Sequence, residues 1–149
     1  MRDVVYEWYV PYVPSRKQML LKAVSLSAAA VLLLDAVFFA LLMVFPALIC
    51  AGAHLFLRLT LEYEYEYVYV NGDFTVSKII RKAKRRDVFH INRPEIEAFT
   101  EGRKKLPGKP ARDFTSSLPN APVYTLEAKG ELVYIEPSEE FINEMKSHR

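Results

Sequence analysis

The chain has 149 residues, a net charge of +2 and a single cysteine, Cys50. This length accommodates one small domain and an anchor, and it excludes two large domains. One thiol excludes an internal disulfide, and no paired-cysteine zinc spacing occurs, so nothing in the sequence indicates an oxidising compartment. The average composition conceals a strong segregation, because the apolar residues gather in one block and the charged residues lie outside it.

The apolar block runs from Met19 to Leu57 and contains 39 residues. As one straight helix it would be about 58 Å long, whereas a hydrocarbon core is about 30 Å thick. The block therefore predicts two helices, a transmembrane hairpin over residues 18–60. The residues in the block that can carry charge are Lys22, Asp35 and His54.

We place the turn of this hairpin between Phe39 and Pro46, because proline is accepted in the first turn of a helix. A turn nearer Asp35 is the alternative. A secretory signal peptide would contain only about 7–15 apolar residues after a basic start, and this block is far longer. It also follows four aromatic residues that we expect at the membrane interface: Tyr6, Trp8, Tyr9 and Tyr12.

Basic residues flank the block on both sides and are absent from the predicted turn. Under the positive-inside rule, this predicts a multi-pass protein of the cell membrane with both termini in the cytoplasm. Residues 1–17 then form a cytoplasmic N-terminal segment, and residues 61–149 form a cytoplasmic domain. The flanking residues are Arg16, Lys17 and Lys22 before the first helix, and Arg58 with the later basic run after the second.

Asp35 is the one acidic residue in the block. A carboxylate at mid-membrane costs about 2.5–3.5 kcal/mol on insertion, so such residues often mark an ion path or a helix partner. The alternative is that Asp35 lies near the outer end of its helix and reaches the headgroups. His54 and Cys50 are expected to be packing residues, and no metal site is predicted.

Aromatic and acidic residues alternate from Glu62 to Tyr67, and aromatic and β-branched residues continue to Val70. This period of two predicts a strand with one buried and one exposed face. We expect the tyrosines in the core and the glutamates in water, because a buried carboxylate without a partner is costly. Asn71-Gly72 predicts a tight hairpin turn, and the next residues to Ile80 predict the returning strand.

Further strands are predicted over Arg85–Ile91 and Glu95–Phe99, with a second hairpin around Lys129-Gly130. Residues 100–122 are rich in Lys, Pro, Gly and Ser, and predict a long exposed loop with partial disorder. A final helix begins after Ser138, with Phe141, Ile142 and Met145 on one face. The fold class is α+β: a transmembrane hairpin followed by a small antiparallel domain of about six strands with a C-terminal capping helix.

Several short motifs carry a family resemblance: the Glu62–Tyr67 repeat, Asn71-Gly72, Ile79-Ile80, the basic run Lys82–Arg86, and the ending Ile135–Phe141. Together they resemble the pleckstrin-homology-like (PH-like) domains of bacterial membrane proteins. The resemblance is closest to a Gram-positive, clostridia-like family of two-helix membrane proteins with a PH-like cytoplasmic domain. It covers nearly the whole chain and implies a PH-like fold for residues 61–149, and none of its motifs is catalytic.

No pattern in the sequence indicates catalysis, a cofactor or a phosphate loop. His90 and His148 have no cysteine or carboxylate at motif spacing. Asp113 and Ser116-Ser117 lie in the predicted long loop, where Ser and Asp are common turn residues. We therefore expect that the protein is not an enzyme and has no catalytic residues, cofactor or metal.

The stretch from Lys78 to Arg112 has twelve basic and four acidic residues, a net charge of +8. Anionic lipids of the cytoplasmic leaflet attract such clusters at about 1 kcal/mol per residue. The alternative is that these charges only help to fix topology. Nucleic acid is not expected as a partner of a membrane-tethered domain. The candidate lipid- or partner-binding residues are Lys78, Arg81, Lys82, Lys84, Arg85 and Arg86.

The sequence thus predicts a membrane-anchored, non-enzymatic interaction module that displays a basic β-rich domain at the cytoplasmic membrane surface. Its expected partners are membrane lipids, with a protein partner or a second copy of the chain as further candidates. The alternative is an accessory subunit of a larger membrane complex or transporter, packed through the helical hairpin.

Overall fold

The computed structural model describes residues 3–147 of the chain. They form two compact units, and each is described by itself. The helical unit is Val13–Glu62, and the β unit combines the residues before Val13 with those after Glu62. The sequence predicts a separate N-terminal segment over residues 1–17, but the described residues before Val13 belong to the β unit.

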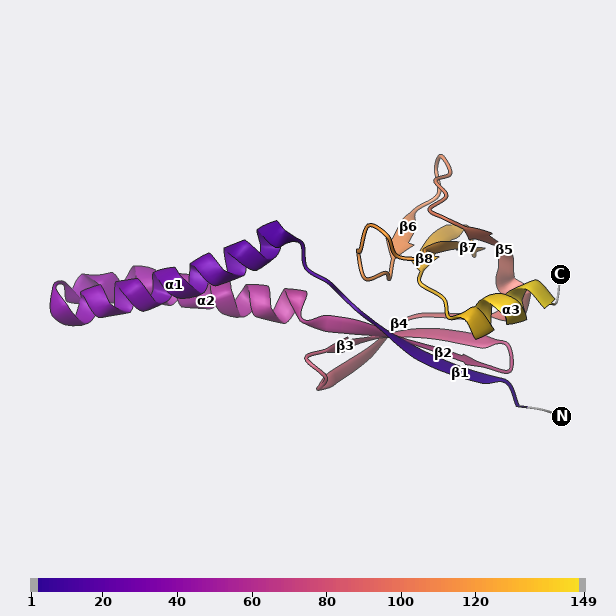
Figure 1. The fold of residues 1–149 in the computed structure, drawn as a ribbon, viewed down its shortest axis with the longest axis horizontal. Coiled ribbons are helices and arrows are strands. Elements are labelled where there is room, and N and C mark those ends of the chain that lie inside the picture. Colours follow the sequence, from indigo (N-terminus) through magenta and orange to yellow (C-terminus); the bar gives the residue numbers. More distant parts are fainter. Residues whose placement is uncertain (1–2, 148–149) are drawn as a thin grey trace. The chain divides into compact units, whose positions relative to one another are not determined.

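Two helices joined by a short turn make up the helical unit (Figure 1). α1 spans Arg16–Phe38 and α2 spans Val44–Leu61, with a short 3₁₀ helix, η1, over Leu41–Met43. The chain reverses within the predicted turn region, and Pro46 lies in the first turn of α2 as expected. The alternative turn near Asp35 is wrong, because this residue lies inside α1.

The two helices pack through small residues and a few polar contacts. Ala29 and Ala36 of α1 and Ala47 of α2 are buried, and small side chains let helix backbones approach closely. His54 Nδ1 lies 3.0 Å from the Lys22 carbonyl oxygen, which ties α2 to α1. Both Arg16–Phe38 and Leu41–Leu61 are long and apolar enough to cross a membrane.

The first sheet of the β unit has the strand order β1-β2-β3-β4, and each neighbouring pair is antiparallel. Asn71 and Gly72 form the β2–β3 turn with positive φ angles of 49° and 102°, which confirms the predicted hairpin. The predicted third strand is confirmed as β4. The strands are β1 (Val5–Pro11), β2 (Tyr63–Val70), β3 (Asp73–Ile80) and β4 (Lys84–Asn92).

β1 corrects the prediction of an aromatic segment at the membrane interface. Trp8 lies inside the β unit, with its ring stacked on Tyr67 at 5.1 Å between centroids. Its indole Nε1 donates a hydrogen bond of 2.9 Å to the Glu136 carbonyl oxygen. The period-two pattern of Val5–Pro11 was available in the sequence, but the same aromatic residues also suit a membrane interface.

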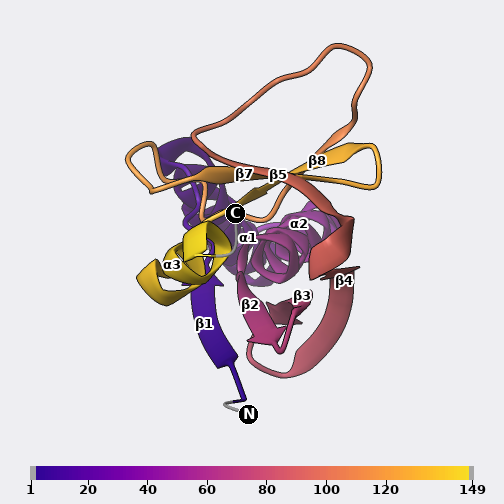
Figure 2. The same ribbon diagram turned by 90° about the vertical axis from the view of Figure 1, so that its right-hand side faces the viewer.

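The second sheet has the order β5-β7-β8-β6, and Figure 2 shows it above the first sheet with α3 at one side. The short β6 pairs in parallel with β8, so the described residues form eight strands in two sheets rather than one meander of six. The loop predicted over residues 100–122 therefore contains a strand. The strands are β5 (Ile96–Glu101), β6 (Ala111–Asp113), β7 (Tyr124–Ala128) and β8 (Glu131–Ile135).

The C-terminal helix α3 spans Glu139–Ser147 and closes the core as predicted. Ser138 Oγ accepts a hydrogen bond of 3.3 Å from the Phe141 amide, which caps the helix. Phe141 is fully buried and its ring contacts Trp8, Phe74 and residues of both sheets. The predicted antiparallel β domain with a capping helix is confirmed.

The two faces of β2 confirm one expectation and correct another. Tyr65, Tyr67 and Tyr69 are buried in the core as predicted. Glu66 was expected in water but is only 4% exposed. The reason is β1, which makes β2 an interior strand: the Tyr9 hydroxyl lies 3.0 Å from one Glu66 oxygen, and Arg85 Nη2 lies 2.8 Å from the other.

Candidate anion-binding surface

The turn between β3 and β4 contains three of the six basic residues predicted to bind lipid or a partner, Arg81, Lys82 and Lys84. Arg81 and Lys82 adopt positive φ angles of 52° and 55°, and Ala83 N donates a hydrogen bond of 3.1 Å to the Ile80 carbonyl oxygen. The side chains at this tip are exposed. We call residues 81–84 the basic turn.

The basic turn lies at the end of the first sheet where β2 begins. Ile80, directly before the turn, pairs with Tyr63, and Lys84, the last residue of the turn and the first of β4, pairs with Ile80. At the same end, Tyr12 N donates a hydrogen bond of 3.0 Å to the Tyr63 carbonyl oxygen. The chain therefore leaves the β unit after Tyr12 and returns at Tyr63 beside the basic turn.

The six predicted binding residues do not form one group, because a β-bulge divides them between two faces. The register of β3 and β4 shifts between Val76 and Ser77, so that Val88 is the extra residue. Side chains alternate along a strand, and the extra residue lets Arg86 and Phe89 share the core-facing side. Lys78 lies directly opposite Arg86 and shares that side.

Arg85 lies on the other face of the sheet and has a structural partner. Its guanidinium lies 2.8 Å from Glu66 Oε2 and 3.9 Å from Asp87 Oδ1. The buried Glu66 carboxylate requires a nearby cation. Arg85 is therefore committed to this contact, and its assignment as a free binding residue does not fit its position.

A cavity of about 410 Å³ opens on the core-facing side beside Lys78 and Arg86. Lys78 Nζ lies 3.8 Å from the centroid of the Tyr63 ring, and burial lowers the pKa of this lysine. The second sheet contributes a third cation, Arg112 of β6. The remaining lining residues are Ile80, Val88 and Phe114, which are apolar, and Asp87.

Arg112 belongs to the basic stretch but is not among the six binding residues that the sequence predicts. Its guanidinium lies 6.0 Å from the centroids of the Phe89 and Phe114 rings, and its Nη1 donates a hydrogen bond of 3.2 Å to the Val88 carbonyl oxygen. Its Nε lies 3.6 Å from Glu131. The sequence could not place it, because its position depends on the parallel pairing of β6 with β8.

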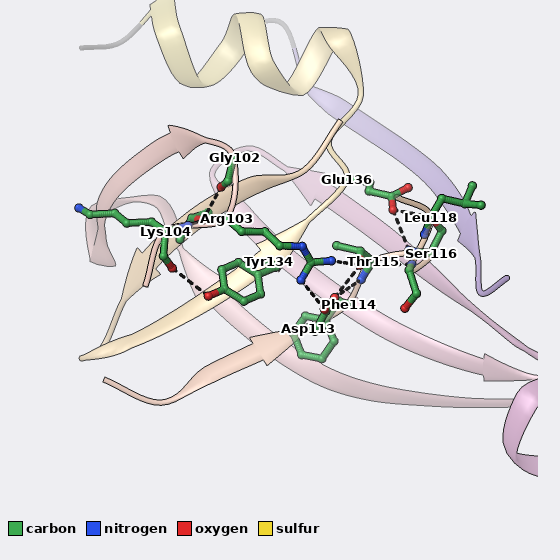
Figure 3. A network of polar contacts seen from close by, with 12 residues as sticks. Gly102, Arg103, Lys104, Asp113, Phe114, Thr115, Ser116, Leu118, Tyr134 and Glu136 are labelled. Atoms are coloured by element: carbon green, nitrogen blue, oxygen red, sulfur yellow. Dashed lines mark hydrogen bonds and ion pairs between the residues drawn. The ribbon is translucent and has the colours of Figure 1, made fainter. Parts of the chain in front are cut away.

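A polar network fixes the segment that carries Arg112 (Figure 3). Asp113 accepts hydrogen bonds of 3.0 and 2.6 Å from the amide and hydroxyl of Thr115, and forms an ion pair of 2.6 Å with Arg103. Desolvation opposes ionisation of Asp113, but the hydrogen bonds from Thr115 and Arg103 outweigh it and lower the pKa. The segment predicted to be partly disordered is thus tied to the sheet.

The same network explains the serine that follows. Ser116 is 2% exposed, and its amide and hydroxyl donate hydrogen bonds of 2.7 and 2.6 Å to Glu136 Oε1. The buried Tyr67 hydroxyl donates to the Phe114 carbonyl oxygen, which anchors the chain just before Ser116. Asp113 and Ser116 are therefore structural residues of an ordered segment.

The other residues singled out from the sequence lie apart from this cavity. His90 is exposed, and its Nδ1 lies 2.9 Å from the Thr75 hydroxyl. His148 lies outside the described residues. Asp35 is in the last turn of α1, near a helix end, and its reach to the headgroups stays a prediction. Within residues 3–147, no group of three or more His, Cys, Asp or Glu side chains could hold a metal ion.

Comparison with known proteins identifies one family. The model of the family described as Bacterial PH-like domain (DUF6106) matches residues 2–149, which include both apolar helices. No curated protein and no solved structure matches the chain. The family match does not test the clostridia-like source, which stays a prediction.

Proposed function

This chain belongs to the bacterial PH-like domain family (DUF6106), and from that premise we propose that it is a membrane-anchored, non-enzymatic interaction module. α1 and α2 cross the cell membrane as a hairpin, both termini are cytoplasmic, and the basic turn meets the anionic lipid surface. One observation supports this proposal. The basic turn lies at the same end of the first sheet as Tyr12 and Tyr63, the residues at which the chain leaves the β unit for the hairpin and returns from it.

Charge supports the same arrangement. Lys82 and Lys84 are exposed and make no ion pair within residues 3–147. Anionic headgroups attract each such residue by about 1 kcal/mol when it lies near the surface. Arg16 and Lys17 at the start of α1, with Arg58 in the last turn of α2, favour the same side of the membrane.

The structure suggests a soluble form of the β unit for the test. Tyr12, directly after β1, donates a hydrogen bond to Tyr63, the first residue of the antiparallel β2, so an Asn-Gly turn can join them in place of residues 13–62. This hairpin-replaced chain keeps β1, which a fragment starting at residue 61 would lose. The only tryptophan, Trp8, is stacked on Tyr67 and reports whether it has folded.

Lipid binding is measured by sedimentation of the hairpin-replaced chain with vesicles. We expect binding to vesicles that contain phosphatidylglycerol, weaker binding to pure phosphatidylcholine, and further weakening as salt shortens the screening length to about 3 Å at 1 M. Replacing Arg81, Lys82 and Lys84 with Gln should abolish most of the binding. The matched control replaces Lys105, Lys129 and Lys146, which are exposed elsewhere. Equal loss in both variants would contradict a specific role for the basic turn.

Orientation needs a separate measurement in the full chain. Ser116 is buried and would report poorly, whereas Lys105 is exposed in the same segment. In a Cys50→Ser background, Lys105→Cys should resist a membrane-impermeant maleimide in intact cells and react after permeabilisation. Labelling of intact cells would overturn the proposed orientation.

An accessory-subunit role is the second candidate, and Asp35 favours it. Its carboxylate makes no hydrogen bond or ion pair within residues 3–147, although it lies on an apolar helix. Such a residue can mark contact with another helix. Gentle detergent extraction followed by a mass measurement separates the two candidates, because a stoichiometric partner co-purifies only with an accessory subunit.

A further inference from the structure

The strongest unexplained feature of the β unit is a pair of like charges placed directly opposite each other. Lys78 of β3 and Arg86 of β4 are cross-strand partners. Like charges in this position destabilise a sheet. Within residues 3–147 neither side chain makes an ion pair, and the pKa of Lys78 is lowered by burial.

A third cation lines the same cavity from the other sheet. Arg112 is held in place by the Val88 carbonyl oxygen, at 3.2 Å, and by the Phe89 and Phe114 rings. Its partner Glu131 lies 3.6 Å away on the Nε side of the guanidinium. The cavity thus collects cations from the β3–β4 hairpin and from β6 of the other sheet.

The carboxylate that lines the cavity does not cancel this charge. Asp87 Oδ1 accepts a hydrogen bond of 2.6 Å from the Ser77 hydroxyl and lies 3.9 Å from Arg85 Nε. In the register of the sheet Asp87 is opposite Ser77, on the face that carries Arg85 and Glu66. The core-facing side therefore has a surplus of positive charge.

We propose that this cavity binds a phosphate group, and that the group belongs to the headgroup of an anionic phospholipid. Lys78, Arg86 and Arg112 supply the charge-assisted donors, and arginine suits the geometry of phosphate oxygens. Ile80, Val88 and Phe114 form an apolar wall that suits the carbon atoms attached to a lipid phosphate. The lipid assignment rests on the proposed function, since it requires the basic turn to face the membrane, whereas the phosphate site itself does not.

This site differs from the surface attraction of the basic turn in what it should recognise. The basic turn offers exposed side chains and should respond to the net charge of the membrane. The cavity has a defined volume, one apolar wall and three cations, so it should bind a phosphate group in preference to a simple carboxylate such as acetate.

The test uses the full chain in phosphatidylcholine nanodiscs, with ¹⁵N-labelled arginine and lysine side chains observed by NMR. The added probes are inorganic phosphate, glycerol 3-phosphate and, as an anion control, acetate. We expect the Arg86 and Arg112 side-chain resonances to shift with both phosphate probes and not with acetate. In nanodiscs that contain phosphatidylglycerol, the same resonances should be shifted before any probe is added.

Two variants and one control decide the assignment. Lys78→Met should weaken the affinity for glycerol 3-phosphate by at least about tenfold, and Arg86→Gln should do the same independently. The control, with Arg81, Lys82 and Lys84 replaced by Gln, should keep the affinity for the soluble probe even though it loses most of its vesicle binding. Trp8 emission shows that each variant is folded.

The outcomes separate the site from the proposed function. Wild-type affinity in Lys78→Met and Arg86→Gln, or equal shifts with acetate, would overturn the phosphate site and leave the basic turn untouched. Binding of the soluble phosphates without any shift in phosphatidylglycerol nanodiscs would overturn the lipid headgroup as the source and support a free phosphate compound. Loss of vesicle binding in the control triple variant tests the proposed function alone.

Discussion

The first half of the basic stretch, residues 78–86, and its second half, residues 103–112, differ in how many of their basic residues form ion pairs with carboxylates. In the second half, Arg103, Lys104, Lys109 and Arg112 each lie within ion-pair distance of a carboxylate of the β unit. In the first half, Arg85 pairs with Glu66, whereas Lys82, Lys84 and Arg86 make no ion pair within residues 3–147. Both halves are rich in basic residues, with six in residues 78–86 and five in residues 103–112. Within residues 3–147, Lys105 is the member of the second half that makes no ion pair.

This difference indicates that pairing, rather than the count of basic residues, separates structural from available charge. Arg112 combines both states, because Glu131 lies on the Nε side of its guanidinium and the residue also lines the cavity. Lys109 illustrates the paired state: its hydrogen bond with Glu127 raises the pKa of the lysine and lowers that of the glutamate. Lys78 illustrates the other state, because burial lowers its pKa and no carboxylate opposes the shift. If pairing decides the role, loss of the groups that anchor the second half should destabilise the β unit, whereas loss of an unpaired cation of the first half should not.

The largest loss of stability is expected at Phe114, which anchors the second half of the basic stretch in the hydrophobic core. Phe114 is 7% exposed, and its ring contacts Tyr65 at 5.4 Å and Phe89 at 6.0 Å. Phe114→Ala should lower the free energy of unfolding of the hairpin-replaced chain by about 3–5 kcal/mol. Urea melts followed by Trp8 emission measure this. Leu118→Ala is the control, since Leu118 is 47% exposed and should change stability by less than about 0.5 kcal/mol.

A smaller loss is expected at Asp113, with a defined pH dependence. Asp113→Ala leaves the buried Thr115 amide without its acceptor and should cost about 2 kcal/mol at neutral pH. The folded-state pKa of Asp113 lies below the ordinary value of 3.8, so its contribution is present above pH 3.8 and is lost as the pH falls through the folded pKa. Asp113→Asn removes the charge of this side chain but keeps an acceptor oxygen. The difference in the free energy of unfolding between wild type and Asp113→Asn should therefore close as the pH falls below the folded pKa of Asp113. A gap that persists unchanged in acid would contradict the assigned role.

Much of the fold could be predicted, because several segments have one dominant local pattern. The alternation in β2, the Asn71-Gly72 turn and the cap at Ser138 each specify local structure without help from distant residues. The length and apolarity of the block around Asp35 specified two helices in the same way.

The remaining features depend on pairing between distant segments. β1 was missed because its aromatic residues fit a membrane interface as well as a strand, and the burial of Glu66 follows from that strand. β6 has only three residues, and its pairing with β8 is parallel, so no local sequence pattern predicts this strand. The candidate cavity combines a bulge at Val88 with this pairing, and neither can be read from the spacing of basic residues.

Arg85 provides the next test, because it lies inside the first half but behaves like the second. Arg85→Gln leaves the buried Glu66 carboxylate with the Tyr9 hydroxyl as its remaining partner. Removing one member of a buried pair is costly, but Arg85 is 55% exposed, so the expected loss is about 1 kcal/mol. Adding Glu66→Gln should recover part of the loss in a double-mutant cycle. Additive effects would show that the two residues do not interact.

The smallest expected change is at Arg86, the neighbour of Arg85 in the chain but on the opposite face. Arg86→Gln removes one of two like charges that face each other across β3 and β4. Stability should stay within about 0.5 kcal/mol of wild type or rise slightly, since opposed like charges cost about 0.2–1 kcal/mol. The sign can be checked with salt, because screening should stabilise the wild type more than Arg86→Gln. A loss as large as that of Arg85→Gln would mean that Arg86 has a structural partner, and the cavity would then have no surplus of positive charge to offer a phosphate group.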